Sequence, residues 1–190
     1  MAIAGANDPH GEERELVSRS AQGDECAFRE LVERHEAAVC ALARWKLRDA
    51  HLAEELAQET FLRLYRSLHT FRFDSSLRTW LSRVTLNLCN DHLRRMQRQA
   101  RATLPAPVQA SEPGPEAAML SREQNQRVNE ALTRLPQELQ EVVLLRYASE
   151  LSYAEIAAAL ALPLGTVCTR LARAVKLLGE EFRAKEAGHA

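Results

Sequence analysis

The sequence predicts an all-α protein built as two small helical domains joined by a linker. Aromatic residues make up only 5% of the chain, Gly and Pro number seven each, and Ala, Leu, Glu and Arg dominate. This composition favours helices and offers few strand formers. No run of four or more alternating β-branched residues predicts a strand. A Pro-rich segment divides the predicted helices into two groups.

The predicted domain boundaries follow these changes in composition. Residues 1–11 are small and polar and are expected to form a tail, and residues 12–101 form the first helical domain. Residues 102–120 are the predicted linker, semi-extended because repeated Pro favours the polyproline conformation. A second helical domain is expected over 121–183, followed by a tail over 184–190.

The first domain shows apolar residues at helical spacing. Asp24 is the expected N-cap of one helix. A second helix is expected to begin near Asp49 and to include Tyr65 among its core-facing residues. A polar and aromatic turn over residues 69–76 then leads into a third helix over residues 77–98.

The second domain contains a pattern typical of a helix-turn-helix. Ser152 and Glu155 form an S-x-x-E capping box at the start of the first helix. Ala161 occupies the turn position usually filled by Gly, where a positive φ costs about 1 kcal/mol relative to Gly. Pro163 stops the first helix and can begin the next. The residues expected in the apolar stripe of the second helix are Val167, Leu171 and Val175.

The second helix of this pattern is cationic on its outer face. It carries Arg170, Arg173 and Lys176, and no acidic residue lies between positions 164 and 178. A helix that is cationic outside and apolar inside suits the DNA major groove. The alternative interpretation is an ordinary helical hairpin with a basic solvated face.

Charge is strongly segregated although the net charge is only −1. Residues 92–101 hold four arginines and no acid, whereas residues 49–59 hold four acids and no Lys or Arg. This segregation predicts one surface for an anion and another for a basic partner.

The cysteines indicate a reducing compartment and no metal site. The four cysteines are scattered without a C-x-x-C pair, and we expect reduced, mostly buried thiols in a cytosolic, cytoplasmic protein. Cys89 and His92 have metal-like spacing, but structural zinc needs four ligands and no second pair accompanies them. The N-terminal residues show no basic stretch followed by an apolar run, so we expect no signal peptide, and no apolar run reaches the ~18 residues that a membrane span needs. The sequence also has no nucleophile–base pair and no P-loop, so we expect no catalytic residue, cofactor, metal, small-molecule substrate or membrane insertion.

Two blocks of the first domain resemble parts of the sigma-70 superfamily. Residues 24–31 (DECAFREL) and 53–62 (AEELAQETFL) resemble the part that binds core RNA polymerase. Residues 71–81 (FRFDSSLRTWL), together with Asn87 and residues 91–95 (DHLRR), are similar to the reader of the −10 promoter element.

A third block, in register with these two, resembles the −35 reader of the same superfamily. It comprises Leu135-Pro136, residues 151–157 (LSYAEIA) and residues 165–167 (GTV), followed by the cationic helix. The order, the linker and the short length are similar to the extracytoplasmic-function (ECF, group IV) sigma factors, which keep only these two domains. The resemblance covers residues 12–182. It implies core RNA polymerase and promoter DNA as partners, and an anti-sigma factor as an inhibitor.

The resemblance also implies three sets of site residues. The polymerase-binding set is Glu55, Gln58, Glu59 and Leu62. The −10 DNA set is Phe71, Phe73, Asp74, Ser75, Ser76, Trp80, Asn87, Arg94, Arg95 and Arg98. The −35 DNA set is Thr166, Thr169, Arg170, Arg173 and Lys176. Other interpretations stay open for some of them: the acidic face could be merely solvated, Trp80 a core residue, and Asn87 a surface amide.

Two other classes of function compete with the sigma factor. A helix-turn-helix regulator could bind an operator as a dimer without polymerase, but it would have no need of the acidic face and the aromatic turn in the first domain. A purely protein-binding helical adaptor would not account for both the arginine cluster and the cationic helix.

Overall fold

The computed structural model describes residues 9–102 and 128–187, and within these ranges every regular element is a helix. The all-α prediction is therefore confirmed. The chain divides into two compact units, one ending at Ala110 and the other beginning at Ser111.

The described helices extend further than the sequence predicted at both ends. The first helix begins at Pro9, so residues 9–11 are helical rather than part of a tail, and the last helix continues to Ala187, beyond position 183. Ala102 still belongs to a helix. The rest of the predicted linker over 102–120 lies outside the described residues, as do residues 121–127.

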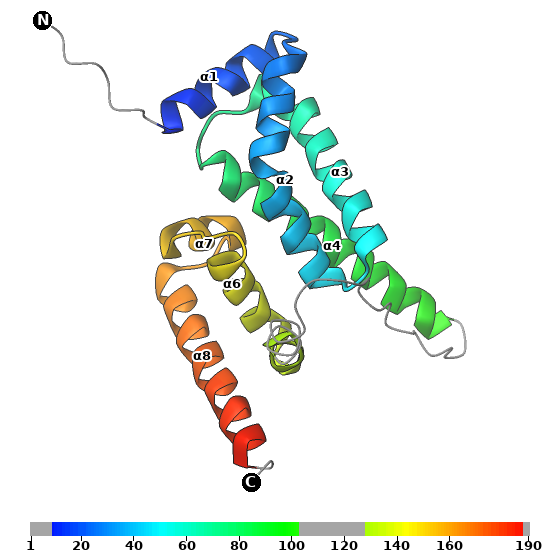
Figure 1. Cartoon of the computed structure of the whole chain (residues 1–190), viewed down its shortest axis with the longest axis vertical. Coiled ribbons are helices and arrows are strands. Elements are labelled where there is room, and N and C mark those ends of the chain that lie inside the picture. The colour runs from blue at the N-terminus through cyan, green and yellow to red at the C-terminus, as the bar shows by residue number, and fades with distance from the viewer. Residues whose placement is uncertain (1–8, 103–127, 188–190) are drawn as a thin grey trace, which may run out of the picture. The chain divides into compact units, whose positions relative to one another are not determined.

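In the first unit, the other helices pack around α2 (Glu25–Leu47). The elements of this unit are α1 (Pro9–Ala21), α2 (Glu25–Leu47), α3 (Ala50–Ser67), the short 3₁₀ turn η1 (Leu68–Thr70) and α4 (Leu77–Ala102). Helix α2 packs against both α3 and α4, and α1 packs against α2 and η1 (Figure 1).

Aspartate caps start the two middle helices where the sequence predicted. Asp24 Oδ1 accepts a hydrogen bond from the Ala27 N–H at 3.0 Å, and Asp49 Oδ1 accepts one from the Leu52 N–H at 3.0 Å. The Ala27 bond and a 2.6 Å contact with the Arg19 guanidinium hold the pKa of the Asp24 carboxyl below its usual range. Both caps satisfy backbone donors that have no partner within the helix.

Leucines form most of the main core of the first unit. Leu31, Leu64, Leu77 and Leu81 are almost completely buried. The prediction that Tyr65 faces this core is wrong, because its neighbour Leu64 already occupies the inward position and Tyr65 is 52% exposed.

The second unit contains the predicted helix-turn-helix. A helix over residues 128–134 is followed by α6 (Gln137–Tyr147), α7 (Tyr153–Leu160) and α8 (Leu164–Ala187) (Figure 1). The capping box is confirmed, since Ser152 and Glu155 each bond the backbone N–H of the other. Ala161 ends α7 with φ at 52°, so the turn does adopt the left-handed conformation.

The apolar stripe of α8 differs from the prediction at its third position. Val167 and Leu171 are buried as expected, but Val175 is 54% exposed and Ala174 is buried instead. A helix has 3.6 residues per turn, so two successive steps of four rotate the third residue away from the contact line. The small Ala174 side chain faces the core and Val175 faces solvent.

The cysteines are less buried than predicted. Cys89 is buried and Cys40 is half-buried, but Cys26 and Cys168 are exposed because they fall on outward faces of α2 and α8. Burial raises the pKa of the Cys89 thiol to about 12. In the described part of the chain, no group of three or more His, Cys, Asp and Glu side chains is placed to hold a metal ion.

No single described helix is long and apolar enough to cross a membrane. Helices α7 and α8 meet the length and composition criteria only as a pair, bent by 107°. This pair is the helix-turn-helix, whose apolar residues Ile156, Val167 and Leu171 are buried in the second unit.

Candidate functional site

The predicted polymerase-binding residues form one stripe along α3. Glu55, Gln58 and Leu62 are exposed, and Glu59 is half-buried. Their spacing of three and four residues places them on one helix face. Glu59 Oε1 accepts a hydrogen bond from Arg63 Nε at 3.0 Å, which fixes its carboxylate at the edge of the stripe.

The stripe is longer than the sequence predicted, because Tyr65 continues it. Leu62 and Tyr65 lie three residues apart and are each about half exposed, at 50% and 52%. The Tyr65 ring meets the Phe28 ring of α2 edge to face, with the centroids 5.1 Å apart. The three-residue spacing from the solvent-facing Leu62 was the signal that could have placed Tyr65 on this surface.

The turn between η1 and α4 brings its aromatic residues together. The Phe71 ring meets Phe73 edge to face at 4.8 Å between centroids and meets Trp80 at 6.0 Å. All three side chains are half-buried and pack against the main core. Trp80 therefore packs against the core and contacts Phe71 of the turn, and its DNA role stays a prediction.

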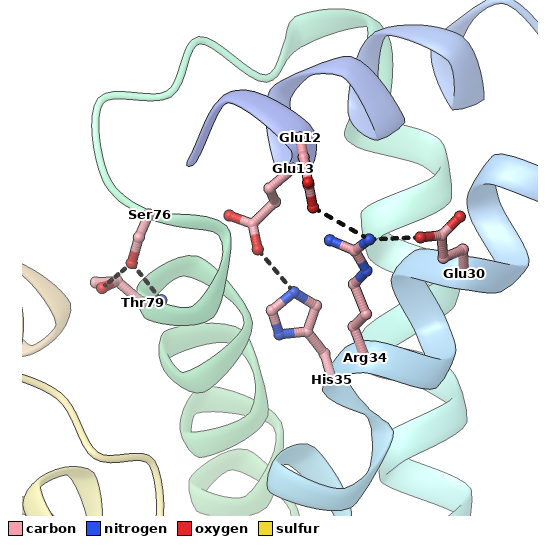
Figure 2. A network of polar contacts seen from close by, with 7 residues as sticks. All are labelled: Glu12, Glu13, Glu30, Arg34, His35, Ser76 and Thr79. Atoms are coloured by element: carbon pink, nitrogen blue, oxygen red, sulfur yellow. Dashed lines mark hydrogen bonds and ion pairs between the residues drawn. The ribbon is translucent and has the colours of Figure 1, made fainter. Parts of the chain in front are cut away.

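The polar residues of the turn have different environments. Asp74 is exposed and Ser75 is half-buried. Ser76 directly precedes α4. Its Oγ accepts a hydrogen bond from the Thr79 N–H at 3.2 Å and lies 2.8 Å from Thr79 Oγ1 (Figure 2). Ser76 thus has a structural role as a helix cap, in addition to the DNA role predicted for it.

Asn87 and the arginines lie further along α4. Asn87 is exposed seven residues beyond Trp80, roughly 10 Å along the helix, and is not part of the aromatic group. Arg94, Arg95 and Arg98 are exposed near the helix end, and two of them line a shallow hollow with Asp91 and Gln97. Arg94 has a loose ion pair with Asp91 at 3.8 Å.

The predicted −35 residues lie on α8, but Arg170, Thr169 and Lys176 have partners within the second unit, the last through a loose contact of its Nζ with Glu180 Oε1 at 4.0 Å. Arg170 is only 24% exposed, and its Nη2 lies 2.6 Å from Glu138 Oε2 at the start of α6. The Thr169 hydroxyl donates to backbone carbonyls of its own helix, including Gly165 O at 2.9 Å. Arg173 and Lys176 are exposed, and Thr166 is half-buried.

Arg146 braces the connection between α6 and α7. Its Nη1 donates a hydrogen bond to the Leu151 carbonyl at 2.9 Å, and its guanidinium lies over the Tyr153 ring, 5.6 Å from the centroid. Sequence reasoning missed both Arg146 and Glu138, because their contacts join residues that no helical spacing connects.

Two family models match the chain. Sigma-70 region 2 matches residues 31–99, which include α3, the aromatic turn and most of α4. Sigma-70 region 4 matches residues 125–178, which include the helix-turn-helix.

Relatives that match most of the chain are named as RNA polymerase sigma factors. The chain is 34% identical over 173 residues to the RNA polymerase sigma-H factor of Pseudomonas aeruginosa, covering 86% of this chain and 90% of the relative. It is 35% identical to the ECF RNA polymerase sigma-E factor of Escherichia coli, covering 84% and 88%. It is 29% identical to the ECF sigma factor SigW of Bacillus subtilis, covering 90% and 96%.

Solved structures agree on the fold. CnrH, determined in complex with the cytosolic domain of CnrY, is 27% identical with a TM-score of 0.71, covering 91% of this chain and 98% of that one. The sigma factor RpoE of Bartonella quintana, determined with the anti-sigma factor NepR, is 24% identical with a TM-score of 0.70, covering 82% and 96%.

An all-helical first unit with a cationic helix end, and a second unit with a helix-turn-helix, define a two-domain transcription factor. The chain belongs to the ECF group of the sigma-70 family of RNA polymerase sigma factors. Such a factor directs core polymerase to promoters and initiates transcription there.

Proposed function

We propose that this sigma factor uses three separate surfaces to bind its partners. The α3 stripe binds core polymerase, the aromatic turn and α4 read the −10 element, and α8 reads the −35 element. The observation that carries this proposal is that exposed cationic faces lie in both regions matched by the family models, while the acidic and apolar stripe is confined to region 2.

The composition of the α3 stripe supports a protein partner. Exposed Glu55 and half-buried Glu59 provide negative charge, and Leu62 and Tyr65 provide apolar surface beside it. An exposed Tyr beside an apolar residue is typical of protein interfaces, and the negative charge next to it complements a basic partner. Large apolar side chains exposed side by side, as Leu62 and Tyr65 are, are more typical of a docking surface than of a merely solvated helix face.

The aromatic turn supports capture of an unstacked base. Removing a base from the stack costs a few kcal/mol, and stacking on an aromatic side chain returns about 1–3 kcal/mol per base. Phe71 and Phe73 are half-buried, so each retains ring surface that a base can contact. Asn87 and the three exposed arginines of α4 are proposed to contact the strand beyond the turn, the arginines through phosphates.

The geometry of α8 supports binding in the major groove. Arg173 and Lys176 are exposed on the face opposite buried Val167 and Leu171. Arg170 lies nearer to the second unit's own surface, where Glu138 orients its guanidinium. We propose Arg170 and Arg173 as base contacts, Thr166 and Thr169 as supporting contacts, and Lys176 as a phosphate contact.

We further propose that the chain has no catalytic activity of its own, acts in the cytoplasm with the polymerase and is held inactive by an anti-sigma factor. The complexes of CnrH with CnrY and of RpoE with NepR motivate the last point. An inhibitor that covers the α3 stripe and α8 would block polymerase binding and promoter recognition together.

Charge reversal on α3 tests the polymerase surface. The double variant Glu55→Lys/Glu59→Lys should weaken binding to core polymerase at least about tenfold, because two attractive charges become repulsive. The matched control is Glu33→Lys/Glu36→Lys, which reverses two exposed acids on α2. Equal affinity of both variants in a titration of fluorescent sigma factor with core polymerase would reject the α3 assignment.

A further inference from the structure

Phe73 has a strained backbone conformation within the turn between η1 and α4. Its φ is 56°, in the left-handed region that bulky side chains rarely adopt. A strained residue of this kind persists only where surrounding contacts hold it in place, and such residues gather at functional sites. The contacts that hold Phe73 therefore decide how its ring is presented.

One of these contacts comes from α1. The Arg14 guanidinium lies over the Phe73 ring, 5.2 Å from its centroid, within the range of a cation–π interaction. Residues of α1, η1 and the turn also line a shared hollow of about 360 Å³. The residues that line it include Val17, Ala21, Leu68, Phe71 and Phe73.

Helix α1 is itself fixed to the body of the first unit. Leu16 and Val17 are buried in the main core. His35 of α2, almost fully buried, has its Nε2 2.9 Å from Glu13 Oε1 (Figure 2). Arg34 Nη2 lies between two carboxylates, 2.5 Å from Glu30 and 3.7 Å from Glu12.

These contacts anchor the helix that carries Arg14. Burial of Leu16 and Val17 holds α1 against the core, and the His35 contact joins Glu13, the residue before Arg14, to α2. The guanidinium is thus held over Phe73 from a fixed helix. The matched region 2 model begins at residue 31, so neither α1 nor Arg14 falls within it.

We propose that α1 is a positioning element for the −10 turn and that Arg14 is a positioning residue, which stabilises the strained conformation of Phe73 by stacking on its ring. This inference rests on the proposed role of the turn in capturing a base. It adds that base capture depends on a residue that contacts no base.

The test measures promoter opening by holoenzyme assembled from core polymerase and sigma variants. Arg14→Ala should slow opening about two- to fivefold, the size of an exposed cation–π contact, and relax the base preference at one −10 position. Arg14→Lys should retain most of the rate, because an ammonium can still stack. Arg183→Ala, which removes an exposed arginine near the end of α8 outside the three proposed surfaces, is the matched control for loss of one positive charge.

A second set of variants separates positioning from direct DNA contact. Phe73→Leu removes the ring, and on that background Arg14→Ala should have no further effect. A direct phosphate contact by Arg14 would instead slow opening equally in both backgrounds and lower the salt dependence of binding. Circular dichroism melts establish that each variant is folded.

The outcomes distinguish the two levels of the proposal. If Phe73→Leu slows opening but Arg14→Ala behaves like Arg183→Ala, or if Arg14→Ala acts independently of Phe73, the positioning role is wrong while base capture by the turn stands. If Phe73→Leu and Asn87→Ala both leave permanganate-detected melting and base preference unchanged, the proposed −10 site itself is wrong.

Discussion

Arg170 combines an intramolecular partner with a proposed DNA contact. Its ion pair with Glu138 at 2.6 Å joins α8 to the start of α6. The pair holds the guanidinium in one direction, which reduces the loss of side-chain entropy when it binds a base. We therefore expect removal of Arg170 to affect both the contact between α8 and α6 and the binding of the promoter.

We expect different effects from the two kinds of cation on α8. Arg170→Ala should cost about 1–3 kcal/mol of −35 binding and relax specificity at one position, as removal of a bidentate base contact does. Lys176→Ala should weaken binding to all sequences evenly and lower the salt slope. Binding of holoenzyme to a set of −35 variants measures both, and an equal weakening on specific and random duplexes would mean that Arg170 contacts only phosphate.

The cysteines provide a test at the level of single side chains. Cys26 and Cys168 are exposed, whereas burial raises the pKa of the Cys40 thiol and raises that of Cys89 to about 12. Thiolate is the reactive form, so a higher pKa slows alkylation. At a pH of about 8, near the ordinary thiol pKa, we expect iodoacetamide to modify Cys26 and Cys168 first, Cys40 more slowly, and Cys89 only after unfolding, as read by mass spectrometry. Early modification of Cys89 would contradict the packing of α4.

At the level of elements, the turn of the helix-turn-helix is strained. Ala161 has φ at 52°, a conformation that costs L-residues roughly 1–2 kcal/mol and Gly very little. Gly also increases the entropy of the unfolded chain, which offsets part of this gain. We expect Ala161→Gly to raise the free energy of unfolding by about 0.5–1 kcal/mol.

A matched change in the adjoining helix serves as the control. Ala158 is exposed within α7, where Ala158→Gly should cost about 1 kcal/mol. Urea unfolding of the two variants measures both effects. Destabilisation by Ala161→Gly of the same size as by Ala158→Gly would contradict the left-handed turn.

The elements with local signals were predictable from the sequence. Asp24, Asp49 and the Ser152/Glu155 box start their helices where expected, because a cap is decided within four residues. The first four residues of the α3 stripe, Glu55, Gln58, Glu59 and Leu62, follow from helical spacing. Tyr65 and Val175 were misplaced because both are apolar residues on an outward face, and periodicity counts apolar residues without knowing which neighbour fills the core.

Contacts between distant residues were not predictable. Arg14 lies over Phe73, and Arg170 pairs with Glu138, across helices that are separated in the sequence. The role of Ser76 as a cap depends on where α4 begins within the turn. Arg14, Glu138 and Ser76 change the interpretation of the candidate sites most. The contacts of Arg14 and Glu138 form only when the helices pack, so sequence spacing cannot reveal them.

At the level of the whole molecule, promoter binding should depend on salt through the arginines of α4. Arg94, Arg95 and Arg98 are exposed, so replacing them by Gln should cost little stability. Removing each phosphate-binding arginine should lower the slope of log affinity against log salt by roughly 0.9. Filter binding of holoenzyme between low and moderate salt measures this slope, with Arg183→Gln, at an exposed position outside the proposed surfaces, as the control. An unchanged slope for the triple variant would place the arginines away from the DNA.

The central claim is that this chain gives core polymerase promoter specificity through a −10 reader and a −35 reader. Run-off transcription with core polymerase and a library of promoters tests it most directly. We predict that the chain selects promoters with one shared pair of −35 and −10 motifs, that core polymerase alone selects none, and that Asn87→Ala and Arg170→Ala each relax a different motif. Specific binding of the free chain to an operator, with no transcription from any promoter in the presence of core polymerase, would contradict the account.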